Sequence, residues 1–222
     1  MVERVAQAIQ AVVLDMDGLM LDTEPIYKLS WQRTCEEFGF QLTDAEYEPY
    51  IGRPTPDCEI ELADHFGPSF PIEEFKTRWP LLWKAMAEQH GIAWRPGLER
   101  LLDLLESRDI PRAVATSSDA EYTDFTLRRA GLNGRFRIVV TRDQVARGKP
   151  APDLYIEAAR RLQQNPAHCL ALEDSDAGAL SATTAGMRVI CIPDLKAPSE
   201  ATARAAFRVV ASLHDVCDLL PG

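Results

Sequence analysis

Short apolar runs, each followed by polar residues, limit the fold of this chain more than any other feature of its sequence. They span residues 11–14, 113–115, 138–140, 169–172 and 189–192. Runs of this length suit strands that are buried on both faces, and such strands belong to parallel sheets. Helical spacing of apolar residues is found between the later runs, at residues 98–105, 152–162 and 178–185. The alternation predicts an α/β fold with a doubly wound parallel sheet.

About a third of the chain separates the first two runs, and this interval has no strand pattern. Residues 25–90 instead have helical spacing, with aromatic residues on two of the helical faces. We therefore predict an inserted α-helical domain over residues 22–96, with breaks near residues 20–23 and 95–97 as hinges. The core would consist of residues 1–21 and 97–222. We expect the aromatic residues of the insertion to form its hydrophobic core rather than a ligand cage.

Composition excludes several classes of function. A formal charge of −10 argues against nucleic acid as a partner, although a small anionic substrate needs only a local cationic pocket. The five cysteines are scattered and form no C-x-x-C pair, so neither a disulfide framework nor a zinc site is expected. Without a run near ~18 apolar residues, no membrane span is predicted. A cytoplasmic protein fits these features, and we expect a monomer or a weak homodimer because the predicted insertion already covers the site.

Polar residues follow the predicted strands at the edge where open parallel sheets bind their ligands. They are Asp15, Asp17 and Gly18 after the first run, Thr116 and Ser117 after the second, and Glu173 and Asp174 after the fourth. A further segment, which contains Lys149, lies just before a predicted helix. Because the carboxyl ends of parallel strands share one edge, we expect these segments to converge.

The expected convergence would crowd four carboxylates around a single obvious cation, Lys149. Two like charges about 4 Å apart repel by roughly 4 kcal/mol at an effective dielectric near 20. Such a cluster must take up protons or hold a cation. All of the candidate ligands are oxygen atoms, and no histidine lies near them in the sequence. A hard ion such as Mg²⁺ is therefore favoured over zinc or copper.

Four segments carry a resemblance to a known family. D-M-D-G-L-M-L-D-T-E, A-T-S-S, G-K-P-A-P-D and E-D-S-D-A-G resemble the motifs of the haloacid dehalogenase superfamily in order and spacing. The helical insertion between the first two motifs makes the chain similar to the β-phosphoglucomutase-like branch. This resemblance implies a Rossmann-like core, a helical cap that selects the substrate, and a phosphatase that acts on a small phosphorylated metabolite.

The resemblance also implies a role for each motif residue. Asp15 would be the nucleophile that becomes phosphorylated, and Asp17 would be the general acid and base. An acid at position 17 favours phosphoryl transfer over halide displacement, which needs no proton. The remaining roles are phosphate binding by Gly18, Thr116, Ser117 and Lys149, and Mg²⁺ binding by Asp15, the Asp17 carbonyl, Asp174 and Glu173, the last as a direct or indirect ligand.

Substrate selection should come from the insertion, because the core motifs recognise only phosphate. Glu24 could hydrogen-bond a substrate hydroxyl or orient the hinge. Arg53 lies in a loop-like stretch where this branch often carries a substrate-contacting loop. Sugar phosphates, phosphoglycolate, and pseudouridine or other nucleotide monophosphates all fit such a capped site.

Three alternative functions remain at this stage. A phosphomutase would use the same aspartyl phosphate, but β-phosphoglucomutases carry a histidine five residues after the position of Asp22, where this chain has Tyr27. A phosphonatase would need a Schiff-base lysine, for which Lys28 and Lys84 are only guesses. A non-catalytic protein that binds a phosphorylated metabolite is disfavoured because Asp15 and Asp17 are both present.

Overall fold

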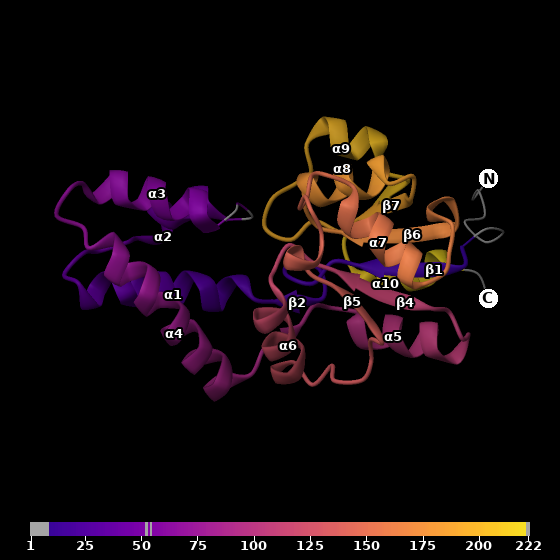
Figure 1. Cartoon of the computed structure of the whole chain (residues 1–222), viewed down its shortest axis with the longest axis horizontal. Helices are drawn as coiled ribbons and strands as arrows, with labels where there is room; N and C mark the ends of the chain where they lie inside the picture. Colours follow the sequence, from indigo (N-terminus) through magenta and orange to yellow (C-terminus); the bar gives the residue numbers. More distant parts are fainter. Residues whose placement is uncertain (1–8, 52, 54, 221–222) are drawn as a thin grey trace. The chain divides into compact units, whose positions relative to one another are not determined.

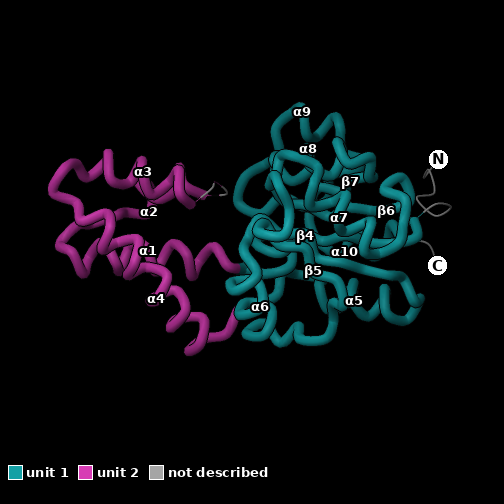
Figure 2. Tube along the Cα trace, viewed as in Figure 1, with its two compact units in different colours: residues 1–22, 93–222 teal, residues 23–92 magenta. Residues whose placement is uncertain are grey.

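The computed structural model describes residues 9–51, 53 and 55–220 and divides the chain into two units (Figures 1 and 2). Unit 1 contains the described residues up to Asp22 and from Ala93 onward, and unit 2 is Thr23–Ile92. Each unit is described by itself below.

Unit 1 is built on a six-stranded sheet in the order β5-β4-β1-β6-β7-β8, in which every neighbouring pair is parallel. The strands are β1 (Ala11–Leu14), β4 (Arg112–Ala115), β5 (Ile138–Val140), β6 (Cys169–Glu173), β7 (Arg188–Cys191) and β8 (Arg208–Val209). The predicted α/β fold with a parallel sheet is confirmed.

Strand β1 lies at the point where the strand order reverses. Its Leu14 is in register with Val114 of β4 on one side and with Leu172 of β6 on the other. The chain runs outward from β4 to β5 on the first side and from β6 to β8 on the second. The edge beyond the carboxyl ends of β1, β4 and β6 is thus the crevice in which doubly wound sheets bind their ligands.

Alternate residues of the central strands face helices α7 (Asp153–Arg161) and α8 (Asp176–Thr184). Helix α7 contacts β1, β4 and β5, and α8 contacts β6 and β7. The core between them contains small residues of the strands and larger residues of α7: Ala11, Val13, Ala113, Ala115, Cys169, Ala171, Leu154 and Tyr155. Because successive strand residues point to opposite faces, Val12 and Leu14 of β1 face the other side.

Of the four other helices that the structure describes in unit 1, the sequence patterns predicted only α5. Helix α5 (Leu98–Ser107) follows the expected leucine spacing and contacts α10 (Leu213–Leu219). Helices α6 (Ala120–Arg129) and α9 (Glu200–Ala205) precede β5 and β8. Short 3₁₀ turns form η3 (Arg142–Gln144) and η4 (Pro166–His168).

A small antiparallel pair corrects the expectation that the insertion interval has no strand. Strands β2 (Leu21–Asp22) and β3 (Ala93–Trp94) pair Leu21 with Trp94 and Asp22 with Ala93. The pair places the unit boundaries at residues 22/23 and 92/93, whereas the sequence had suggested that the second boundary follows residue 96. Two-residue strands are too short to produce a period of two, so no sequence pattern indicates them.

Unit 2 is helical and has an aromatic core. Its elements are α1 (Glu24–Glu37), α2 (Asp44–Tyr47), η2 (Glu48–Tyr50), α3 (Thr55–Phe66) and α4 (Ile72–His90). Trp31 packs edge-on against Phe75 with ring centroids 5.2 Å apart, and at 5.8 Å from Trp79. All three rings are buried, which confirms that these aromatic residues form a core.

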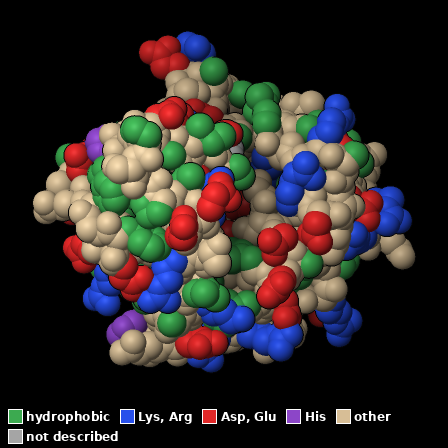
Figure 3. All heavy atoms as spheres, turned by 60° about the vertical axis from the view of Figure 1, so that its left-hand side comes forward, with side chains coloured by type: hydrophobic (Ala, Val, Ile, Leu, Met, Phe, Trp, Pro, Cys, Tyr) green, Lys and Arg blue, Asp and Glu red, His purple; other side chains and the backbone are tan. Residues whose placement is uncertain are grey.

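The cysteines lie in the interior, and charges of both signs are mixed on the surface. All five cysteines are buried free thiols. Asp and Glu side chains are interspersed with Lys and Arg side chains on the face shown in Figure 3. Among the described helices, none combines the length and the apolar character that a bilayer span requires.

Candidate active site

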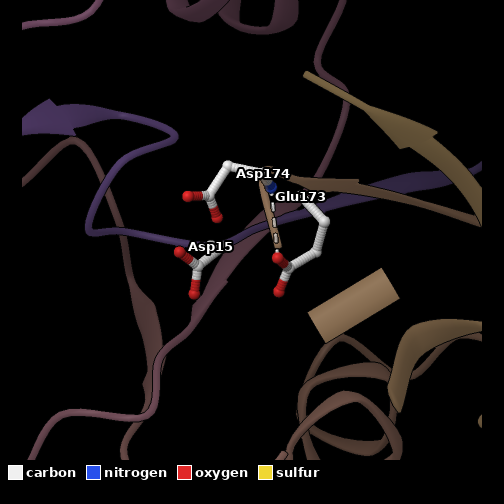
Figure 4. A group of neighbouring side chains, drawn as sticks. All are labelled: Asp15, Glu173 and Asp174. Atoms are coloured by element: carbon white, nitrogen blue, oxygen red, sulfur yellow. Dashed lines mark hydrogen bonds between the residues drawn. The ribbon is translucent and has the colours of Figure 1, made fainter. Parts of the chain in front are cut away.

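Three carboxyl groups converge at the carboxyl edge of the central strands (Figure 4). Asp15 follows β1, Glu173 is the last residue of β6, and Asp174 follows it. One carboxylate oxygen of each lies within 4.8 Å of the others. We call these three residues the carboxylate cluster. The structure therefore brings together three of the four acidic residues that the sequence placed at this edge of the sheet, and Asp17 is not a member of the cluster.

Gly18 makes room for Asp174 in this cluster. The residue has a φ of +81°, a conformation that costs glycine little and other residues much more. A Cβ atom at this position would lie 2.3 Å from Oδ2 of Asp174, so any larger residue would displace the carboxylate. The N–H of Gly18 donates to the Leu21 carbonyl at 2.9 Å. Gly18 thus shapes the turn, and its own N–H is already engaged.

Lys149 lies between Asp15 and Glu173. Its Nζ forms an ion pair with Oδ1 of Asp15 and another, at 2.5 Å, with Oε1 of Glu173. The side chain is only 5% exposed. Burial alone would lower the pKa of Lys149, but the two carboxylates raise it above its ordinary value, so the ammonium stays charged.

The carboxylate cluster carries more negative charge than Lys149 can balance. Burial raises the pKa of Asp15 to about 7, against the opposing effect of Lys149, and Glu173 and Asp17 raise it further. Burial also raises the pKa of Asp174 well above its usual range, with Asp15 and Glu173 adding to the shift. Three carboxylates face one ammonium, which leaves two negative charges uncompensated when all are ionised.

Glu173 is already saturated with hydrogen-bond donors. Its Oε1 accepts from Lys149 and from the Tyr155 hydroxyl, each at 2.5 Å. Its Oε2 accepts from the N–H groups of Asp174 and Ser175 and from the Ser175 hydroxyl, at 3.1 to 3.3 Å. A carboxylate has about four lone-pair sites, so little capacity remains for a metal ion. This geometry favours an indirect role for Glu173 in holding Lys149 over direct metal ligation.

The carboxylate cluster fits a hard divalent cation. Its donors are all oxygen atoms, and two charges of the opposite sign would balance the excess. Oxygen ligands of an octahedral Mg²⁺ at about 2.1 Å lie roughly 3 to 4 Å apart, which is within the 4.8 Å limit that encloses the three oxygens here. Asp15 and Asp174 are the members whose oxygens have capacity for such an ion.

Thr116 and Ser117 follow β4 in different environments. Thr116 is buried, and its Oγ1 accepts from the Ser118 N–H at 3.1 Å, which leaves the hydroxyl proton available for donation. Its own N–H donates to the Val140 carbonyl of β5 at 3.0 Å. Ser117 is exposed. Of these two predicted phosphate ligands after β4, Thr116 is therefore the one that the sheet holds in place.

Asp17 is held by two hydroxyl groups, one of which the sequence did not indicate. The Ser118 hydroxyl donates to Oδ2 at 3.0 Å, and the Tyr122 hydroxyl donates to Oδ1 at 2.9 Å. Ser118 belongs to the A-T-S-S segment, whereas Tyr122 lies in the first turn of α6, outside all four motifs. A tyrosine on a helix gives no local signal of such a contact. Only the convergence of α6 and the first motif reveals it.

Comparison with known proteins identifies the protein family of this chain. The model of the haloacid dehalogenase-like hydrolase family matches residues 12–192, a range that contains all four motifs. The chain belongs to this family. The resemblance and the hydrolase class predicted from the motifs are confirmed.

Relatives in the haloacid dehalogenase-like hydrolase family include named phosphatases. A "Probable pseudouridine-5'-phosphatase" of Drosophila melanogaster is 32% identical over 97% of this chain and 94% of its own length. A "Phosphorylated carbohydrates phosphatase" of Thermotoga maritima is 32% identical over 82% of this chain and 83% of its own length. Among solved structures, a candidate β-phosphoglucomutase of Thermotoga maritima matches with a TM-score of 0.84 and 28% identity, covering 95% of this chain and 98% of that one.

The predicted substrate residues of this family member lie in unit 2, where each already has a partner. Oε1 of Glu24 accepts from the Tyr47 hydroxyl at 2.8 Å. The Arg53 guanidinium forms two hydrogen bonds with Glu61, at 2.7 and 2.5 Å. Tyr27, at the position discussed for a mutase histidine, packs within 5.7 Å of Trp79.

Proposed function

We propose that this protein is a Mg²⁺-dependent phosphatase that hydrolyses a small phosphomonoester, such as a sugar phosphate, through a phosphorylated Asp15. The observation that carries the proposal is the carboxylate cluster with Lys149 embedded in it. Three carboxylates and one ammonium in a buried volume form a site that is incomplete without a divalent cation. Family membership gives the reaction class, and the named relatives above support a phosphate ester as the substrate.

In the first step, a carboxylate oxygen of Asp15 forms a bond to phosphorus while the bond from phosphorus to the leaving oxygen breaks. Asp17, in its protonated form, gives its proton to that leaving oxygen, so that an alcohol departs. The products of the step are the free alcohol, an acyl phosphate on Asp15 and an ionised Asp17.

In the second step, Asp17 takes a proton from a water molecule whose oxygen bonds to phosphorus. The bond between phosphorus and the Asp15 oxygen breaks, which restores the Asp15 carboxylate and releases inorganic phosphate. Asp17 ends in its protonated form, ready for the next cycle. The same side chain is thus the acid of one step and the base of the other.

The other site residues would position the phosphoryl group. Lys149 would neutralise charge on the phosphoryl oxygens, and Thr116 would donate its hydroxyl proton to one of them. Mg²⁺ held by the Asp15 and Asp174 carboxylates and the Asp17 carbonyl would supply positive charge that reduces the repulsion between nucleophile and phosphate. Glu173 would hold Lys149 in place through their ion pair.

The helical unit 2 would select the leaving group in this proposal. Glu24 and Arg53 remain our candidates, and each would have to exchange its present partner for a substrate group. We propose to compare glucose 6-phosphate, ribose 5-phosphate, glycerol 3-phosphate and pseudouridine 5'-phosphate as probes. The rank order of kcat/KM would define the substrate class.

The activity test measures phosphate release from these probes and from p-nitrophenyl phosphate with Mg²⁺ and with a chelator. We expect release only with Mg²⁺, and at least ~100-fold less with Asp15→Asn, because an amide is a poor nucleophile. Asp176→Asn is the matched control, since Asp176 is exposed and accepts from Ser199 at 3.0 and 3.1 Å outside the carboxylate cluster. Equal activity with Asp15→Asn would refute the proposed nucleophile.

Mg²⁺ binding can be tested without any turnover. A ligand that binds only the folded state at 100 times its Kd stabilises that state by about 2.7 kcal/mol, so saturating Mg²⁺ should raise the melting temperature. Asp174→Asn should reduce this increment strongly, whereas Asp176→Asn should retain it. If wild type and Asp174→Asn respond to Mg²⁺ equally, the ion does not bind at the carboxylate cluster.

Assays of the same protein distinguish the proposed function from two alternatives. Incubation with a hexose 1-phosphate gives free phosphate from a phosphatase and a hexose 6-phosphate from a mutase. A protein that only binds phosphorylated metabolites would be stabilised by them and would release no phosphate. Tyr27 packs against Trp79 and Trp83 with ring centroids 5.7 and 5.5 Å apart, so it is part of the aromatic core. A tyrosine at the position where β-phosphoglucomutases carry a histidine favours the phosphatase.

A further inference from the structure

Both oxygens of the Asp17 carboxylate accept hydrogen bonds from hydroxyl groups. Tyr122 donates to Oδ1 at 2.9 Å and Ser118 donates to Oδ2 at 3.0 Å. All three side chains are partly buried. Asp17 is separated from both donors by more than 100 positions in the sequence, so the folded core alone creates the contact. The four motifs give Tyr122 no role.

Both donors are themselves fixed by the backbone around them. Asp119 caps helix α6 and accepts from the Tyr122 N–H at 2.8 Å, which sets the first turn of the helix. The Ser118 N–H donates to Thr116 Oγ1 at 3.1 Å, and the Ser118 carbonyl accepts from the Arg142 N–H at 2.9 Å. The two hydroxyls are therefore presented from a rigid loop and a capped helix.

One donor on each oxygen restrains the carboxylate more than two donors on the same oxygen would. An aspartate side chain without partners samples several rotamers, and its terminal torsion is broad. Donors at 2.9 and 3.0 Å on opposite oxygens fix both torsions at once. The carboxylate is thus held in place on both of its oxygens.

We propose that Tyr122 is a positioning residue that, together with Ser118, fixes the orientation of Asp17 for proton transfer to the leaving oxygen. This inference rests on the proposed function, because it concerns the acid of the first step. A general acid acts only within hydrogen-bond reach of the atom that it protonates, and a misplacement of about 1 Å can cost ~100-fold in rate. Tyr122 itself exchanges no proton in this scheme.

The inference predicts a dependence on the leaving group that a merely structural role would not produce. An alkoxide is a poor leaving group, so its departure needs the proton that Asp17 delivers. The p-nitrophenolate ion departs readily without a proton. Loss of the Tyr122 hydroxyl should therefore slow the first step with an alkyl phosphate far more than with p-nitrophenyl phosphate. The constant kcat/KM reports this step, since it ends at the departure of the leaving group.

The experiment compares wild type with Tyr122→Phe, Ser118→Ala and the control Thr126→Val at saturating Mg²⁺. Its probes are p-nitrophenyl phosphate and whichever of glucose 6-phosphate, ribose 5-phosphate, glycerol 3-phosphate or pseudouridine 5'-phosphate the wild type hydrolyses with the highest kcat/KM. Thr126→Val removes a buried hydroxyl from the same helix, where Oγ1 of Thr126 has no hydrogen-bond partner among the described residues. This control should match wild type with both probes.

We expect Tyr122→Phe to lower kcat/KM for the alkyl phosphate by roughly tenfold to 100-fold, and for p-nitrophenyl phosphate by no more than about threefold. Ser118→Ala should show the same selectivity, which keeps the test decisive if Tyr122→Phe does not fold. Equal losses with both probes, or no loss with the alkyl phosphate, would overturn the positioning role and leave the proposed function standing. A wild type that hydrolyses none of the probes would overturn both.

Discussion

The Tyr155 hydroxyl donates a 2.5 Å hydrogen bond to Oε1 of Glu173, and both side chains are fully buried. The same oxygen accepts from Lys149 at 2.5 Å. Burial and the neighbouring Glu173 raise the pKa of Tyr155 well above its usual range, so the phenol stays protonated and remains a donor. Lys149 Nζ also lies 5.3 Å above the centre of the Tyr155 ring. Tyr155 therefore supports the lysine through Glu173 and through its ring face.

Replacing Tyr155 with phenylalanine should destabilise the protein while keeping the ring in place. The change removes a buried hydrogen bond to a charged acceptor, and such bonds contribute about 1.5 to 3 kcal/mol. We expect a fall of that size in the free energy of unfolding measured with urea near pH 7. Tyr50→Phe is the control, because the Tyr50 hydroxyl has no hydrogen-bond partner among the described residues, and its loss should change stability by less than ~0.5 kcal/mol. Similar small effects in both variants would argue against a structural role for the Tyr155 hydroxyl.

Gly178 in helix α8 should resist the substitution that helix propensity favours. Alanine is normally better than glycine inside a helix by about 1 kcal/mol. Here a Cβ atom would lie 1.9 to 2.1 Å from the carboxyl atoms of Glu173. Gly178→Ala should therefore displace Glu173, lower stability by roughly 1 to 3 kcal/mol and reduce phosphate release at least ~10-fold.

The control for this change is Ala177→Gly, at the exposed neighbouring position of the same helix. It should cost about 0.5 to 1 kcal/mol through propensity alone and leave phosphate release unchanged. Urea unfolding and a phosphate-release assay measure both effects. A Gly178→Ala protein that is more stable than wild type and fully active would show that the Glu173 side chain can move without loss of stability or activity.

The sheet could be predicted from the sequence because its central strands are buried on both faces. Residues 11–14 coincide with β1 and residues 169–172 lie within β6, and every residue of both strands is buried. Strand β8 was missed because Arg208 and Val209 are both exposed and form no apolar run. Helix α6 was also missed, since its buried positions include Thr123 and Thr126, which a pattern of apolar residues does not count. Burial by tertiary packing, rather than local composition, defines these elements.

The carboxylate cluster could be predicted because its members follow apolar runs that the sequence reveals, Asp15 after residues 11–14 and Glu173 and Asp174 after residues 169–172. The supporting residues could not, because their roles depend on contacts between distant elements. Tyr122 reaches Asp17 across 105 positions, and Tyr155 reaches Glu173 across 18. A signal for Tyr155 did exist in the sequence. A polar hydroxyl on the buried face of the helix predicted at residues 152–162 requires a partner.

Two threonines of helix α6 should respond to valine in opposite directions. Oγ1 of Thr126 is buried without a hydrogen-bond partner among the described residues, so its replacement removes an unsatisfied polar group. The Thr123 hydroxyl is also buried, but it donates to the Asp119 carbonyl at 2.6 Å. We expect Thr126→Val to raise the free energy of unfolding by about 1 kcal/mol and Thr123→Val to lower it by a similar amount. Thermal and urea unfolding of the two near-isosteric variants measure the difference. A loss of stability in Thr126→Val would indicate that this hydroxyl is satisfied in solution.

Glu157 should make a contribution to stability that disappears in acid. Its carboxylate accepts hydrogen bonds of 2.7 Å from both Arg160 and Arg161, and Arg161 also donates to the Val139 carbonyl of β5 at 3.0 Å. The hydrogen bonds from Arg160 and then Arg161 lower the pKa of Glu157 from 4.5 to about 2. A carboxyl group whose pKa is lower in the folded state stabilises that state fully above its unfolded pKa, here 4.5, and loses this effect as the pH falls toward about 2.

We therefore expect wild type to exceed Glu157→Gln in free energy of unfolding by no more than about 1 kcal/mol near pH 7, because the pair is close to the surface. The difference should begin to shrink below pH 4.5 and be nearly gone as the pH approaches 2, the two values between which Glu157 takes up its proton. Urea unfolding of both proteins at a series of pH values measures it. Glu200→Gln is the control, since the Glu200 and Arg204 side chains are 89% and 74% exposed and their pair should contribute little at any pH. A difference that stays constant down to pH 3 would mean that the two arginines stabilise Glu157 no better than water does.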